Sequence, residues 1–131
     1  MEKLLHSEIT DKILLSFFTV SRDLSKEMEG FFKNAIEIEF KHNGLQVQKD
    51  KLIDLKYRNF KIGEISCDFL INDLVLVKLN SETEINQQIE EESKMLLKNS
   101  KFEICLILNI FGDHDFKRII FTNEYKKQDK E

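Results

Sequence analysis

Three polar residues interrupt an apolar β-hairpin and are the best candidates for chemistry in this sequence. Between Ile65 and Asn80, the acidic residue Asp68 interrupts the first predicted apolar strand, and two polar residues, Lys78 and Asn80, interrupt the second. An acidic side chain in a buried strand is destabilising unless it is paired with a cation or holds a metal ion. The hairpin therefore marks a candidate functional site.

The length of the hairpin loop decides whether these side chains meet. A two-residue loop at Asn72 and Asp73 would set Asp68 opposite Val77, whereas a three-residue loop sets it opposite Lys78. A slip of one residue moves every side chain of a strand to the other face of the sheet. A common site therefore requires the longer loop or a β-bulge.

The hydrophobic periodicity predicts the elements that position this hairpin. Helical spacing is present at 7–24, 28–42 and 82–99, and strand patterns are present at 45–56, 60–71, 74–79, 101–111 and 116–122. This order predicts an α/β (α+β) fold with helices packed on one mixed sheet. Ser81 and Glu84 form a capping box for the third helix. We expect one domain, 1–131, with a frayed tail at 123–131.

The hairpin and the helices around it resemble the GxxExxY family of the PD-(D/E)XK nuclease superfamily. Members have two leading helices, a hairpin carrying D-x(9)-E-x-K and a helix carrying Q-x(3)-Y, so the resemblance implies a restriction-endonuclease-like core. Asp68, Lys78 and Asn80 stand at the family's Asp, Glu and Lys, and the nine-residue gap is preserved. The resemblance extends over residues 9–123.

The motif that names the family is partly present on the second helix. Glu29 matches the motif Glu, whereas Lys26 and Phe32 stand at the positions of its Gly and Tyr. Residues 44–45 are Gly-Leu, as the family has after this helix. The order of these short motifs supports the resemblance more than any one of them does.

The departures from the family pattern argue against catalysis. The resemblance implies that the Asp and Glu hold Mg²⁺ and that the metal and the Lys activate water. Lys78 instead places a cation at the metal position, and Asn80 has no charge and cannot act as a base. Two unit charges about 4 Å apart interact by about 4 kcal/mol at an effective dielectric of about 20, enough to abolish metal binding. On the later helix, Glu92 and Leu96 replace Gln and Tyr.

Two roles are open for Lys78. It forms a salt bridge that neutralises Asp68 and Glu29, which we favour, or it faces a phosphate and binds nucleic acid without cutting it. The chain carries 20 Lys and Arg against 24 Asp and Glu, a formal net charge of −4. A negative molecule attracts nucleic acid weakly, although a local cleft can still be basic.

Composition excludes several other classes of function. The 131 residues include four glycines and no proline, which leaves no glycine-rich phosphate loop. Cys67 and Cys105 lie in apolar runs without partners at ligand spacing, so buried free thiols are expected and zinc is not. The sequence shows neither a signal peptide nor an apolar run of transmembrane length, which favours the cytoplasm.

Other charged groups have simpler interpretations. His114 is flanked by Asp113 and Asp115, but adjacent side chains in a turn seldom converge, so we expect a solvated loop. The run 90–92 is all Glu and is interpreted as a solvated helix face, with a possible acidic lip beside the cleft.

Three hypotheses about function remain. The preferred one is a catalytically inactive nuclease-fold protein that acts as a binding or regulatory module, through a protein partner or self-association, without a cofactor. The second is a divergent nuclease that uses Mg²⁺ or Mn²⁺ and recruits Glu82 or Glu84 as its missing acid. The third is a nucleic-acid-binding protein without activity.

Overall fold

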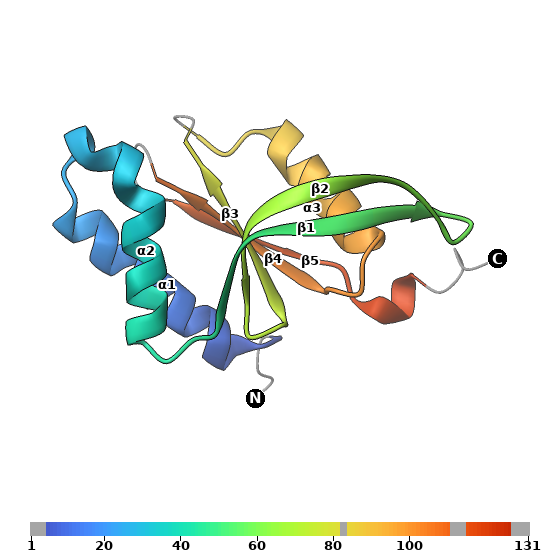
Figure 1. The fold of residues 1–131 in the computed structure, drawn as a ribbon, viewed down its shortest axis with the longest axis horizontal. Coiled ribbons are helices and arrows are strands. Elements are labelled where there is room, and N and C mark those ends of the chain that lie inside the picture. The colour runs from blue at the N-terminus through green and yellow to red at the C-terminus, as the bar shows by residue number, and fades with distance from the viewer. Residues whose placement is uncertain (1–4, 82–83, 111–114, 127–131) are drawn as a thin grey trace.

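A five-stranded mixed sheet forms the centre of the computed structural model, which describes residues 5–81, 84–110 and 115–126. The strands are β1 (Val47–Tyr57), β2 (Phe60–Ile71), β3 (Val75–Asn80), β4 (Ile104–Asn109) and β5 (Phe116–Ile120). They lie side by side in sequence order, and only β3 and β4 are parallel to one another. Figure 1 shows β1 and β2 as a long hairpin that extends away from α1 and α2.

Helices cover both faces of this sheet. The helices α1 (Ser7–Asp23) and α2 (Phe32–His42), joined through the 3₁₀ turn η1 (Lys26–Phe31), lie together on one side. The helix α3 (Gln87–Lys98) lies on the other side and provides the crossover that two parallel strands require. No helix within the described parts of the chain has both the length and the apolar character needed to span a membrane.

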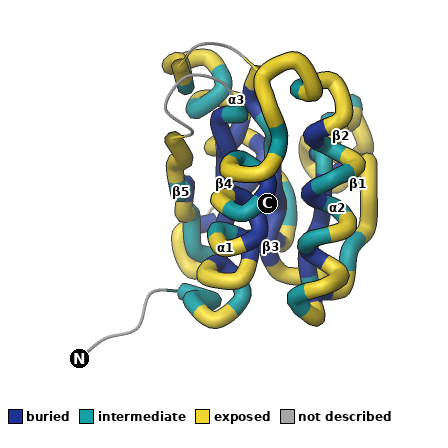
Figure 2. The backbone as a smooth tube through the Cα atoms, turned by 90° about the vertical axis from the view of Figure 1, so that its left-hand side faces the viewer, coloured by how far each residue is buried: buried dark blue, intermediate teal, exposed yellow. Residues whose placement is uncertain are grey.

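Two hydrophobic cores lie on the two faces of the sheet. The α2-side core contains Phe17, Ile36 and Phe40 of the helices together with Phe69 and Val77 of the strands. The α3-side core contains Leu96 and Leu97 of α3. The strands contribute the alternate positions Leu70, Leu76, Cys105 and Ile107. Every residue of β4 is buried, as Figure 2 shows for the centre of the sheet. These layers confirm the predicted mixed α+β class.

The start of α3 differs from the prediction. Residues 84–86 are not helical, and the cap is Asn86, whose side-chain oxygen accepts a hydrogen bond from the Ile89 N–H at 3.0 Å. The predicted capping box at Ser81 and Glu84 is therefore wrong. The Asn80 side chain holds the Glu84 carbonyl at 3.1 Å, which keeps this segment out of the helix.

The end of the described chain is also more ordered than predicted. Residues Asn123–Tyr125 form the 3₁₀ turn η2. The Asn123 N–H donates to Glu103 Oε2 at 2.8 Å, and Lys126 Nζ donates to the Phe102 carbonyl at 2.6 Å. The first residues of the predicted frayed tail are thus tied to the loop before β4, and 127–131 lie outside the described residues.

The hairpin between β2 and β3 has the longer loop that a common site requires. Phe69 pairs with Val77 and Ile71 pairs with Val75, so residues 72–74 form the loop. Asn72 and Asp73 adopt left-handed backbone angles, with φ of 53° and 60°, which Asn and Asp tolerate better than most residues. Continuing this register sets Asp68 level with Lys78.

The aromatic packing between α2 and β2 yields a first prediction. The Phe69 ring is fully buried and meets the Phe40 ring edge-on, with centroids 5.2 Å apart. Phe69→Ala should lower the free energy of unfolding by about 3–5 kcal/mol in urea denaturation, because it removes the contact with the Phe40 ring and leaves a cavity in the core. Ile62→Ala, on the same strand but 68% exposed, should change it by less than about 0.5 kcal/mol. Equal effects of the two substitutions would contradict this packing.

Candidate functional site

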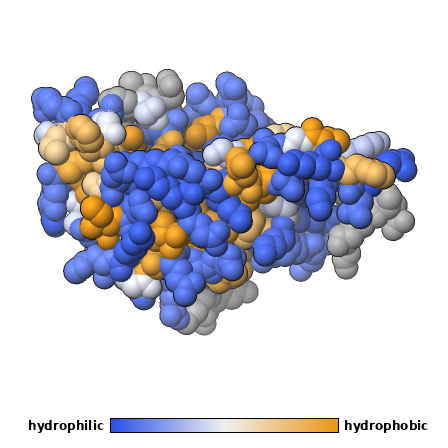
Figure 3. Space-filling view, in the orientation of Figure 1, coloured by the Kyte–Doolittle hydropathy of each residue, from blue (hydrophilic) through white to orange (hydrophobic). Residues whose placement is uncertain are grey.

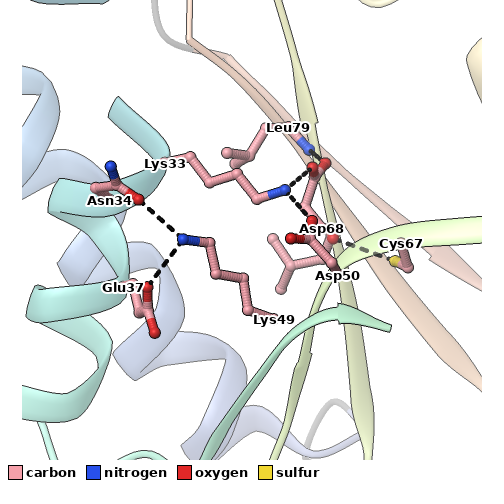
Figure 4. Close-up of polar contacts among 9 residues, drawn as sticks. Lys33, Asn34, Glu37, Lys49, Asp50, Cys67, Asp68 and Leu79 are labelled. Atoms are coloured by element: carbon pink, nitrogen blue, oxygen red, sulfur yellow. Dashed lines mark hydrogen bonds and ion pairs between the residues drawn. The ribbon is translucent and has the colours of Figure 1, made fainter. Parts of the chain in front are cut away.

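Asp68 lies in the middle of the sheet with both carboxylate oxygens engaged by nitrogen donors. Its Oδ1 is 3.0 Å from Lys33 Nζ of α2, and its Oδ2 accepts a 2.7 Å hydrogen bond from the Leu79 N–H of β3. The side chain is 28% exposed. Figure 4 shows these contacts where α2, β2 and β3 meet. The carboxylate is therefore neutralised and oriented by the fold itself.

Lys33 is the cation that sequence reasoning missed. It lies between Asp68 and Asp50, contacts both carboxylates, and stands over the Phe69 ring at 5.8 Å from its centroid. Burial is the largest single effect on the pKa of Lys33 and lowers it, but the bonds and charges of the two aspartates together raise the pKa above its ordinary value. The hydrogen bond from Lys33 lowers the pKa of Asp50.

A local distortion of β1 and β2 turns Asp68 toward α2. The ladder pairs Lys49 with Phe69 and Lys51 with Cys67 but omits the pair Asp50 and Asp68, and Asp50 has a φ of 55°. Both Asp68 and the next residue, Phe69, contact Lys33, so two successive side chains face α2. Regular alternation would have sent Asp68 to the α3 side. The distortion decides which cation the acid meets.

Lys78 lies on the other face of the sheet from Asp68. Its ammonium is 3.1 Å from Glu92 Oε1 of α3, and its side chain is 12% exposed. The predicted salt bridge from Lys78 to Asp68 and Glu29 is therefore wrong. The register sets residues 68 and 78 level, but the distortion at Asp68 separates their side chains by the thickness of the sheet.

Asn80 is buried at the ends of the two parallel strands. It pairs with Asn109 in the ladder, and its Nδ2 donates to the Asn109 Oδ1 at 3.3 Å and to the Glu84 carbonyl at 3.1 Å. The Ile110 N–H in turn donates to the Asn80 carbonyl at 2.9 Å. This amide links the end of β4 to the segment that follows β3.

Glu29 is not joined to Asp68 by any bond within the described residues. It lies in η1, and its Oε2 is buried without a hydrogen-bond partner in that part of the chain. The neighbouring motif position, Phe32, is a core residue whose ring meets Phe17 at 6.1 Å between centroids. Leu96, on the later helix, is fully buried in the α3-side core. The aromatic and aliphatic replacements thus serve packing.

The glutamates of α3 are only partly a solvated face. Glu92 binds Lys78, and Glu90 Oε2 binds Lys117 of β5 at 3.0 Å, whereas Glu91 is exposed. Within the described residues, no group of three or more His, Cys, Asp or Glu side chains is arranged to hold a metal ion. Of the site residues named from the sequence, Asp68 contacts Lys33 on the α2 face, whereas Lys78 and Glu92 contact one another on the α3 face.

The two cysteines are buried free thiols, as predicted. Cys67 Sγ donates to the Val77 carbonyl at 3.2 Å, and Cys105 lies on β4 in the same α3-side core. The contact with Cys105, followed by burial, raises the pKa of Cys67 well above its ordinary value. The predicted loop at His114 cannot be compared, because residues 111–114 lie outside the described residues.

A weak signal for Lys33 is present in the sequence. Lys33, Ile36 and Phe40 are spaced as i, i+3 and i+7, so this lysine belongs to the edge of the buried stripe of α2. A second lysine, Lys49 of β1, contacts α2 through Asn34 at 2.9 Å and Glu37 at 3.4 Å. No sequence pattern links these positions to Asp68, because the contact depends on how α2 docks.

Comparison with known proteins identifies the fold family. Residues 7–120 match the family model of the PD-(D/E)XK nuclease superfamily. The chain belongs to this superfamily. An alkaline exonuclease from Laribacter hongkongensis is similar in structure, with a TM-score of 0.46 and 15% sequence identity over 76% of this chain. The match spans 59% of the exonuclease chain. No curated protein shows significant sequence similarity.

The position of Lys33 between two carboxylates predicts how stability depends on pH. Asp50 has a lowered pKa in the folded state, so its contribution is present above its ordinary value of 3.8 and is lost as the pH falls below it. Lys33 has a raised pKa, so its contribution is present below 10.5 and is lost as the pH rises through the folded pKa.

Replacing Lys33 should weaken both of these pH dependences. Lys33→Met should reduce the loss of stability both at acidic pH below 3.8 and at alkaline pH above 10.5, as measured by thermal unfolding across pH. Lys12→Met, which removes a lysine of α1 that has no ion pair among the described residues, should retain the parent profile. Identical profiles for the two variants would show that Lys33 does not couple to these acids.

Proposed function

We propose that this protein is a divergent member of the GxxExxY family that has lost nuclease activity and acts as a binding or regulatory module. Membership of the wider superfamily rests on the family match over 7–120. The finer assignment is supported by Glu29 at the motif Glu and by the nine-residue gap between Asp68 and Lys78. The positions at which the sequence departs from the family pattern are those on which catalysis would depend.

The observation that carries this proposal is that both oxygens of the Asp68 carboxylate already contact nitrogen donors, one of them a lysine ammonium. Lys33 Nζ and the Leu79 N–H occupy its two oxygens at 3.0 and 2.7 Å. A divalent ion at this carboxylate would have to approach an ammonium already in contact with it. Repulsion between a divalent ion and a neighbouring ammonium adds to the cost of breaking the ion pair.

The other two motif positions support the same conclusion. Lys78 supplies a cation where the family pattern has a metal-binding acid, and that cation is paired with Glu92 at 3.1 Å. Asn80 supplies an amide where the pattern has a basic residue, and this amide is engaged by Asn109 and by the Glu84 carbonyl. Neither side chain is available to activate water.

No specific observation favours a divergent nuclease. Of the two acids proposed to replace the missing ligand, Glu84 is exposed and forms no ion pair within the described residues, and Glu82 lies outside them. Association with a protein partner or with a second copy of the chain stays a prediction. The cytoplasmic location and the single domain over 1–131 stay predictions as well.

Metal binding tests the proposal directly. In calorimetric titration with Mn²⁺, the unaltered chain should show no saturable heat at concentrations up to about 1 mM, corresponding to about −4.1 kcal/mol of binding free energy. Neither Mg²⁺ nor Mn²⁺ should support cleavage of DNA or RNA. The reason is that Asp50, Asp68 and Glu92 are already paired with lysines.

Removing the two lysines provides the matched positive control. Lys33→Met with Lys78→Glu frees Asp68 and places a second carboxylate beside Glu92, so this double variant should gain Mn²⁺ affinity. Its folding is checked by urea denaturation before titration. Tight Mn²⁺ binding by the unaltered chain that disappears in Asp68→Ala would refute the loss of the metal site. Metal-dependent cleavage that disappears in the same variant would refute the loss of activity.

A further inference from the structure

A cleft of about 1350 Å³ lies between the β1–β2 hairpin and the carboxyl end of α3. The hairpin contributes one wall, and the segment that follows α3, which includes Phe102, contributes the other. The cleft shares no lining residue with the degenerate site, since Asp68, Lys78, Asn80 and Glu92 are all absent from its walls. Its chemistry therefore has to be considered separately.

The cleft concentrates unpaired positive charge. Lys51, Lys56 and Arg58 line the hairpin wall, and Lys98 and Lys101 line the opposite wall. None of these five cations forms an ion pair within the described part of the chain, whereas Lys33, Lys49, Lys61, Lys78 and Lys117 all do. On a chain with a formal net charge of −4, this local excess is a specific feature.

The acidic residues of the cleft do not cancel this charge. Of the two that line it, Asp54 is paired with Lys61 at 3.4 Å, and Asp73 Oδ1 accepts a hydrogen bond from Gln48 at 3.3 Å. Lys126 also lines the cleft, but its ammonium is held by the Ser100 and Phe102 carbonyls. Five cations without an ion pair among the described residues therefore face two acids, of which only Asp54 is paired with a lysine. Three of the five, Arg58, Lys98 and Lys101, stand over aromatic rings.

Aromatic faces stand exposed beside these cations. Phe60 lines the cleft and is 75% exposed, and Tyr57, its partner across the hairpin, is 62% exposed. The Arg58 guanidinium lies 5.8 Å from the Tyr57 ring centroid. Figure 3 shows hydrophobic atoms interspersed among hydrophilic ones along the projecting hairpin. Exposed rings beside lysines and an arginine are available to a ligand that carries both negative charge and flat rings.

We propose that this cleft binds single-stranded nucleic acid. A positively charged groove with exposed aromatic rings is the arrangement that holds a phosphate backbone while the bases stack on the rings. A duplex keeps its bases stacked on one another and would leave Phe60 unused. An acidic peptide would satisfy the lysines but offers the rings no flat partner. This inference goes beyond the loss of catalysis at the degenerate site and stands independently of it.

Binding of a fluorescently labelled oligothymidylate, followed by anisotropy, tests the inference. Five phosphate contacts predict a slope of about −3.5 for log affinity against log salt, so raising salt from about 50 to about 200 mM should weaken binding roughly 100-fold. Lys101→Glu should weaken binding by about tenfold. Lys12→Glu makes the same change of charge at an unpaired lysine of α1, outside the cleft, and should change affinity by less than about twofold.

The contribution of base stacking to binding is tested separately with variants of Phe60. Phe60→Ala should weaken oligothymidylate binding by about 5- to 150-fold and leave the salt slope unchanged, because stacking of a base is lost while the phosphate contacts remain. Phe60→Leu keeps an apolar side chain and should lose affinity to a similar degree. Phe60 is largely exposed, so both variants should fold like the parent in urea denaturation.

Several results would overturn the inference. Absence of oligothymidylate binding at low salt would do so, as would equal effects of Lys101→Glu and Lys12→Glu. Equal affinity for a duplex of the same length, with no effect of Phe60→Ala, would reduce the cleft to a general phosphate-binding surface. Tighter binding of a polyglutamate peptide would assign the cleft to an acidic protein partner instead. None of these outcomes depends on whether the degenerate site binds Mn²⁺.

Discussion

A carboxylate in the middle of a sheet has to be neutralised, and the way Asp68 is neutralised determines much of this structure. Leaving such a charge unpaired away from water would cost several kcal/mol. Lys33 supplies the opposite charge, and the Leu79 N–H supplies a second donor. These two contacts link α2, β2 and β3 at one point, so the docking of the helix and the register of the hairpin are coupled. The distortion at Asp50 is part of the same arrangement, because Lys33 binds Asp50 as well.

The three hairpin positions predicted to match the catalytic groups of the GxxExxY family form internal contacts. Asp68 is bound by Lys33, Lys78 by Glu92, and Asn80 by Asn109 and a loop carbonyl. A side chain held in this way has to break an existing contact before it can bind a ligand, and that cost is subtracted from its affinity. The proposed loss of nuclease activity therefore involves more than missing groups, because the remaining ones stabilise the fold.

The cleft beneath the β1–β2 hairpin contains cations that form no ion pair among the described residues. The lysines near the degenerate site are paired with acids, whereas those of the cleft beneath the β1–β2 hairpin have no ion pair in the described residues. Since a paired lysine presents little net field to an approaching polyanion, the charge that matters is that of Lys51, Lys56, Arg58, Lys98 and Lys101. The net charge of −4 describes the whole chain and conceals this local excess.

The fold class, the order of the elements and the buried state of both cysteines could be predicted from the sequence, because these properties depend on hydrophobic periodicity and local burial. The sequence also placed Asp68, Lys78 and Asn80 on one hairpin. It showed that the length of the hairpin loop decides whether Asp68 lies opposite Lys78. The contacts of Lys33 with Asp68 and of Lys78 with Glu92 could not be predicted in this way and follow from the packing of the helices on the sheet. The physical reason is that strand alternation is a local rule, which one distorted residue pair overrides, and that the partner of a charge depends on which helix docks against each face.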